Sequence, residues 1–158
     1  MTRNLLAIYL NDHLAGATAG LELARRARGS NQATPLGDFL DRLATEIAED
    51  RETLIEAMNR LDVRRDPIKV VAAWSGEKVG RLKLNGQLTG YSPLSRVIEL
   101  EGLHLGITGK LELWRTLQRT SEGRLGGVDL DALIKRAEAQ RRGLAPHRRS
   151  AIEEAFGP

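Results

Sequence analysis

The sequence predicts an all-α protein made of long helices, and three observations support this class. Aromatic residues make up only 4% of the chain, so aliphatic residues must form the core, and leucine and alanine among them favour helices. Several long segments repeat apolar residues at the spacing of an amphipathic helix. Serine, threonine or aspartate, in most cases followed by proline, stands directly before these segments, as at helix starts.

A chain of 158 residues is long enough to bury one core, and we expect a single helical-bundle domain over residues 1–158. Apolar residues at 41% and charged residues at 28% are ordinary values for a soluble globular protein. The sequence has no cysteine, which excludes disulfides, thiolate metal ligands and a cysteine nucleophile. This composition fits the reducing cytoplasm.

The first half of the chain predicts two long helices. The first is expected over about Thr2–Arg28, with Gly29 after it as a stop signal. Asn11–His13 interrupts its apolar start, so we expect a first helix here rather than a signal peptide. Thr34 as N-cap opens the second helix, which is expected over about Pro35–Leu61.

The second half predicts one shorter helix and two long ones. Asp66 and the proline after it repeat the cap-plus-proline signal, and a helix is expected over about Pro67–Leu84. Ser92 caps a helix expected over about Pro93–Arg119. Asp129 caps the last long helix.

Gly143 and Pro146 within the last helix predict a kink or a break into two pieces. The order of elements is therefore two long helices, a connection that holds its own helix, and two further helices. Such a connection can cross a bundle from end to end, which is the topology of ferritin-like folds. A plain up-and-down bundle of five or six helices is the alternative.

Four ionisable residues fall on predicted apolar faces near the middle of their helices. His13 lies on the apolar stripe of the first long helix, and Asp50 lies on that of the second. Glu101 and His104, within "IELEGLHLG", lie one turn apart on one face of the third. Burying a bare charge is costly, so these groups must be paired, protonated or bound to metal. Their similar depth on three helices predicts that they meet.

The spacing Glu101-x-x-His104 resembles the Glu-x-x-His element of ferritin-like di-metal carboxylate proteins. The stretches "YLNDHLAGATAG", "EIAEDRETL", "KLNGQLTGYSPLSR" and "ELEGLHLGITGKLELW" resemble a family of small bacterial ferritin-like proteins of unassigned biochemical role. This resemblance covers most of the chain. It implies a ferritin-like four-helix bundle with a helix-containing crossover between the second and third long helices, and it implies no activity.

The match to a di-metal centre is incomplete, because Glu-x-x-His occurs on the third long helix alone. Arginines on or near the inner face of the last helix would repel a metal cluster but neutralise buried carboxylates. One alternative is therefore a metal-free buried network, and the other is a bound iron, manganese or zinc ion. The candidate residues are His13, Asp50, Glu101 and His104, joined in the metal-free case by Arg141 or Arg148.

Five other charged residues on these helices are expected at the solvated surface or in local pairs. They are Glu46, Glu49, Glu99, Lys110 and Glu112. A third possibility is a small-molecule pocket, because glycines could leave space between the helices, although close helix packing would also explain them. These glycines are Gly16, Gly20, Gly102, Gly106 and Gly109.

Together these patterns predict a non-enzymatic protein with a structural or interaction role; the alternative is a metal-binding protein with redox activity. No phosphate-binding loop or hydrolase motif is present. The net charge of +3 is spread over short arginine clusters near helix ends, so no nucleic-acid partner is expected. No apolar run reaches the length of a membrane span, so we expect a cytoplasmic protein. A homodimer through Leu113, Trp114 and Leu117 is a further expectation.

Overall fold

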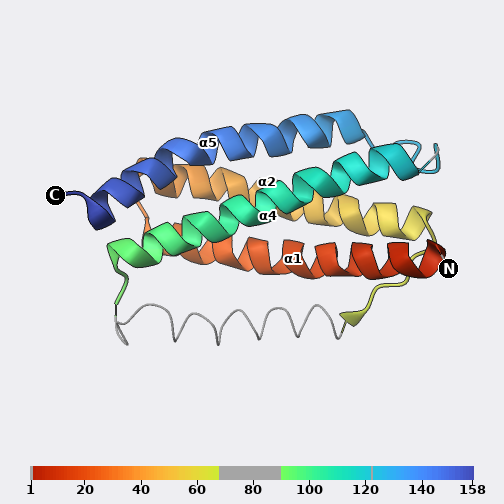
Figure 1. Ribbon diagram of the computed structural model, residues 1–158, viewed down its shortest axis with the longest axis horizontal. Helices are drawn as coiled ribbons and strands as arrows, with labels where there is room; N and C mark the ends of the chain where they lie inside the picture. Colours follow the sequence, from red (N-terminus) through yellow and green to blue (C-terminus); the bar gives the residue numbers. More distant parts are fainter. Residues whose placement is uncertain (1, 68–89, 122) are drawn as a thin grey trace.

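The computed structural model describes residues 2–67, 90–121 and 123–158, which form four long helices lying side by side (Figure 1). These are α1 (Thr2–Ser30), α2 (Pro35–Arg60), α4 (Pro93–Thr120) and α5 (Leu130–Phe156). No strand occurs in these residues, which confirms the predicted all-α class and the four-helix bundle. The helix predicted over Pro67–Leu84 lies, apart from Pro67 itself, outside the described residues.

The predicted caps begin three of the four helices. The Thr34 hydroxyl accepts a hydrogen bond from the Gly37 amide at the start of α2. Ser92 and Ser95 form a reciprocal capping box at the start of α4, and the Asp129 carboxylate accepts from the Ala132 amide at the start of α5. Each cap satisfies an amide that has no partner within its own helix, so the helix starts follow from local sequence.

Two apolar clusters, one toward each end of the bundle, fix the directions of the helices. One cluster joins the second halves of α1 and α5 to the first halves of α2 and α4; the other joins the opposite halves. Consequently α2 and α4 run parallel to each other and antiparallel to α1 and α5 (Figure 1). Representative members are Leu23, Leu40, Leu100 and Leu144 in the first cluster and Leu10, Met58, Leu117 and Leu133 in the second.

Helix α5 is continuous through Gly143 and Pro146, so the predicted break does not occur. Pro146 lies on the exposed side, where water can satisfy the carbonyl group that loses its helical partner. Gly143 faces α2, and a β-carbon at this position would lie 2.8 Å from Cε2 of Phe39. The glycine therefore serves close packing between α2 and α5 instead of ending the helix.

Two buried asparagines fasten the chain segments that follow α2 and precede α4. The Asn11 side chain accepts a hydrogen bond from the Asp66 amide at 2.7 Å and donates to the Arg64 carbonyl at 3.0 Å. Asn31, just after α1, donates to the Tyr91 hydroxyl at 2.9 Å. Asn11 lies in the first half of α1 and Asn31 directly follows its last residue, so the two attachments are about 30 Å apart along the helix.

No helix among the described residues is both long and apolar enough to cross a membrane.

We expect Asn11→Ala to lower the free energy of unfolding by about 1–3 kcal/mol, since it removes two part-buried hydrogen bonds at about 0.5–1.5 kcal/mol each. Chemical denaturation measures this change. Asn4→Ala, at an exposed position of the same helix, is the matched control and should have little effect. Equal losses in the two variants would contradict the anchoring role of Asn11.

Candidate functional site

Asp50 is the centre of a polar network in the middle of the bundle. Its side chain is 2% exposed, and it lies in the gap between the two apolar clusters. Lys110 Nζ of α4 lies 2.5 Å from one carboxylate oxygen, and Arg136 Nη1 of α5 lies 3.0 Å from the other. A buried carboxylate must be neutralised and hydrogen-bonded, and here two cations from two helices provide both.

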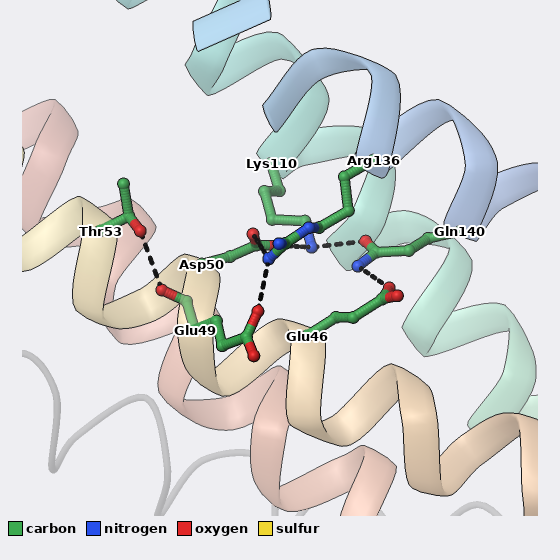
Figure 2. Close-up of polar contacts among 7 residues, drawn as sticks. All are labelled: Glu46, Glu49, Asp50, Thr53, Lys110, Arg136 and Gln140. Atoms are coloured by element: carbon green, nitrogen blue, oxygen red, sulfur yellow. Dashed lines mark hydrogen bonds and ion pairs between the residues drawn. The ribbon is translucent and has the colours of Figure 1, made fainter. Parts of the chain in front are cut away.

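The network continues across α5 and returns to α2 (Figure 2). Lys110 Nζ donates to Gln140 Oε1 at 2.6 Å, and Gln140 Nε2 donates to Glu46 Oε2 at 2.7 Å. Arg136 also donates to Glu49 at 2.9 Å, near the surface. Three helices are therefore linked by a closed set of hydrogen bonds.

The structure corrects the surface positions predicted for Lys110 and Glu99. The Lys110 side chain is only 13% exposed, and Glu99 is buried beside Arg26, with a carboxylate–guanidinium distance of 3.6 Å. Burial lowers the pKa of Lys110 although Asp50 opposes this shift, and burial raises the pKa of Glu99. A sequence signal existed for Lys110, because it lies one helical turn from both Ile107 and Trp114.

Gln140 and Arg136 are further network members that the sequence analysis did not identify. Gln140 is buried and lies one turn from both Ala137 and Leu144 on the inner face of α5. The helical spacing therefore predicts that Gln140 faces inward. Its side chain carries no charge that would have to be neutralised, so the sequence did not indicate that it belongs to a network. The arginine that contacts Asp50 is Arg136, and not Arg141 or Arg148 as predicted.

A cavity of about 280 Å³ lies beside the network, between α1, α2 and α4. Its wall combines aliphatic side chains with Tyr9, His13, Asp50, Lys110 and Trp114. Four of the five glycines singled out from the sequence line it. A β-carbon added at Gly16, Gly20 or Gly106 would have no neighbour within 4 Å, so this space is not used for close helix packing.

His13 lies in the wall of this cavity, on α1. Its ring packs edge-on against Tyr9, with a distance of 4.5 Å between the ring centroids. Burial lowers the pKa of His13, and Asp12 only partly opposes this effect. His13 is therefore mainly a neutral imidazole at neutral pH, with one donor and one acceptor nitrogen.

Glu101 and His104 lie apart from Asp50, toward α5. Glu101 has an exposed fraction of 50% and its carboxylate lies 3.8 Å from the Arg148 guanidinium. Glu101 is therefore not buried as expected, and its contact with Arg148 lies outside the Asp50 network. Burial together with the charges of Arg148 and Arg141 lowers the pKa of His104.

The physical reason for this difference is the composition of α4, which has leucines on most of its faces. Leu105 is 71% exposed and Leu94 is 36% exposed, so apolar residues of α4 do not by themselves mark its inner face. The buried face instead runs along Leu100, Leu103 and Ile107. Glu101 is consequently rotated away from the centre of the bundle.

Metal ligation by His13, Asp50, Glu101 and His104 gains no geometric support from the described residues. In residues 2–67, 90–121 and 123–158, no three His, Asp or Glu side chains converge as a metal site requires. Both oxygens of Asp50 contact cations from the protein itself. Binding of iron, manganese or zinc stays a prediction.

Leu113, Trp114 and Leu117 are each at most 1% exposed, so the predicted dimer surface is instead part of the core of the single chain. A homodimer through other residues stays a prediction.

Comparison of the sequence with protein-family models, curated proteins and solved structures gave no match. The resemblance to small ferritin-like proteins therefore also stays a prediction.

We expect Asp50→Asn to lower the free energy of unfolding by about 3–5 kcal/mol, because Lys110 would keep a buried charge without its carboxylate partner. Glu49→Gln is the matched control: it removes the neighbouring carboxylate, which contacts the same arginine at the surface. We expect Glu49→Gln to lower the free energy of unfolding by less than about 1 kcal/mol. Urea denaturation compares the two, and similar costs would contradict a central role for Asp50.

We also expect acid to destabilise the protein through its partly buried histidines. Because burial lowers the pKa of His13 below 6.5, the unfolded chain binds more protons than the folded chain between those two values. The free energy of unfolding therefore rises with pH through this window and falls on acidification below 6.5. His104 and His147 also have lowered pKa values and contribute with the same sign.

Measurement of the melting temperature at about pH 7.5 and about pH 5.5 tests this linkage. His13→Gln should lose less stability on acidification than the wild type, since one lowered pKa has been removed. An identical acid-induced loss in the variant and the wild type would show that His13 does not contribute.

Proposed function

We propose that the protein is a non-catalytic bundle that binds a compact, largely apolar molecule between α1, α2 and α4. The cavity beside the Asp50 network is the observation that carries this proposal. Binding sites for small molecules are concave, mostly apolar and provided with a few convergent polar groups. The combination of Leu54, Leu103 and Ile107 with His13 and Lys110 has this character.

The size of the cavity supports a ligand rather than a packing defect. An apolar cavity of about 150 Å³ in a protein core is large enough to bind benzene. The cavity here measures about 280 Å³, which leaves room for a substituted ring or a short branched chain. Gly16 and Gly106 line it and are exposed, so a ligand can enter from the side between α1 and α4.

The contacts of Asp50 and Lys110 support a structural role for both. Both oxygens of Asp50 contact cations, and Lys110 contacts both Asp50 and Gln140. Neither therefore has the accessible group, not already neutralised, that a general base or a nucleophile needs. The network instead fits the structural role expected from the sequence, in which it holds α2, α4 and α5 in register.

We further propose that the fold is ferritin-like, with a crossover that carries the chain from α2 to α4. The parallel direction of these two helices supports this topology, because a short hairpin loop joins only antiparallel neighbours. Asn11, in the first half of α1, and Asn31, directly after its last residue, contact the two ends of the connection about 30 Å apart. A plain up-and-down bundle would place consecutive helices antiparallel throughout.

Filling the cavity should abolish binding without unfolding the protein. We expect p-xylene to bind the wild type, and Gly20→Leu to remove this binding, because a leucine at this position can occupy the space on the inner side of α1. Leucine also favours the helix over glycine by about 1 kcal/mol, so the melting temperature should not fall.

Gly29→Leu is the matched control, since Gly29 is also on α1, has no neighbour within 4 Å of an added β-carbon, and does not line the cavity. Saturation-transfer NMR and calorimetry report binding of p-xylene to all three proteins. Binding that survives in Gly20→Leu as well as in Gly29→Leu would place the ligand elsewhere and contradict the proposal.

A further inference from the structure

We infer that the ligand of this cavity is a compact organic acid whose carboxylate is held by the ammonium group of Lys110. This inference rests on the proposed binding function and deepens it by naming the chemical class of the ligand. It depends on three features of the site: the unused hydrogen-bonding capacity of Lys110, the neutralised state of Asp50, and the apolar character of the remaining wall.

Lys110 reaches the cavity with one donor to spare. A lysine ammonium has three N–H donors. One donates to Asp50 Oδ2 at 2.5 Å and a second donates to Gln140 Oε1 at 2.6 Å. Lys110 also lines the cavity, and its side chain is 13% exposed. The third N–H is therefore available to an acceptor inside the cavity, and a carboxylate makes the strongest such bond.

The charges around Lys110 favour an anion over a cation. Asp50 is shared between Lys110 and Arg136, so its single negative charge faces two positive ones. Glu49 contacts Arg136 at the surface, and Glu46 is hydrogen-bonded by Gln140 on the side of α5. Neither Glu46 nor Glu49 lines the cavity, so a ligand ammonium beside Lys110 would meet a like charge, next to an Asp50 carboxylate that two cations already contact.

The other charged residues that line the cavity are Asp12 and Arg51, which carry opposite charges. Arg51 Nε donates to Thr18 at 3.1 Å, and its guanidinium contacts Glu52 at 2.7 Å. His13 is mainly neutral and adds no charge at neutral pH. Arg51 uses two of its five N–H donors in these contacts, one of them with exposed Glu52, whereas Lys110 has its remaining donor beside the Asp50 network.

The remainder of the wall requires that the acid carry an apolar body. Ile47 and Leu54 of α2 and Leu103 and Ile107 of α4 face the cavity from two sides. On α4, Ile107 and Lys110 are one turn apart, so an apolar group against Ile107 can be joined directly to a carboxylate at Lys110. A compact aromatic or branched aliphatic acid has this form.

Three probes of similar shape test separately whether the cavity binds a ligand and whether it prefers an acid. They are p-xylene, 4-methylbenzoate and 4-methylbenzylamine, which carry a neutral, an anionic and a cationic substituent. We expect 4-methylbenzoate to bind at least about tenfold more tightly than p-xylene, as expected for one charge-assisted hydrogen bond in a partly buried site. The amine should bind more weakly than either.

Lys110→Met should remove the preference for the acid and leave the binding of p-xylene in place, because methionine keeps an apolar side chain of similar length. Arg136→Met is the matched control, since it removes the same charge from the same network but does not line the cavity. The control should keep the preference of the wild type for 4-methylbenzoate.

A measurement on the wild type keeps the test independent of the folding of these variants. The carboxyl-labelled ¹³C resonance of bound 4-methylbenzoate should titrate at a lower pH than that of the free acid, because Lys110 stabilises the carboxylate form. If the bound acid titrates at the same pH as the free acid, or at a higher pH, the assignment to Lys110 is overturned.

The outcomes also separate the two proposals. Binding of p-xylene with no preference for the acid, or with a preference for the amine, would overturn the ligand class and leave the binding function standing. Failure of both p-xylene and 4-methylbenzoate to bind the wild type would contradict the binding function itself.

Discussion

The neutralisation of Asp50 is the constraint on which the rest of the bundle depends. This carboxylate lies between two apolar clusters that otherwise would meet. Its burial requires cations, and these come from α4 and α5, so the three helices must keep one rotation and one register about it. Apolar residues in place of Asp50, Lys110 and Arg136 together could fill the same volume, but they would not specify which side chains of α4 and α5 face inward.

The network also explains why an open space can persist next to a packed core. On the side of α5, Gln140 and Arg136 complete the contacts of Asp50 and Lys110. On the side of α1, small residues line the cavity that Asp50 and Lys110 also line. Lys110 is therefore structural toward α5 and keeps one donor for the cavity, so a binding site is possible without a separate set of polar residues.

The parts of the structure that local sequence determines could be predicted. Thr34, Ser92 and Asp129 act as caps because their side chains satisfy amides a few residues away. The inward position of Asp50 also followed from helical spacing, since apolar residues flank it at one-turn intervals on α2. The rotation of α4 did not follow, because a helix with leucines on most faces has no clear inner side until its neighbours are known; Leu105 shows this most directly. Likewise, Lys110 was predicted at the surface because its carboxylate partner lies sixty residues away on another helix.

Asn11 of α1 and Asn31 directly after it also constrain the length of this helix. The helix between Asn11 and Asn31 is about 30 Å long, and this length sets the distance between the two ends of the segment that joins α2 to α4. Any segment long enough to span this distance could make the contacts with both asparagines. A single residue inserted into α1 between them would instead turn one asparagine by about 100° away from its partner. Tolerance to insertions should thus be concentrated in the segment joining α2 to α4, while the helix beside it is held to a fixed count of residues.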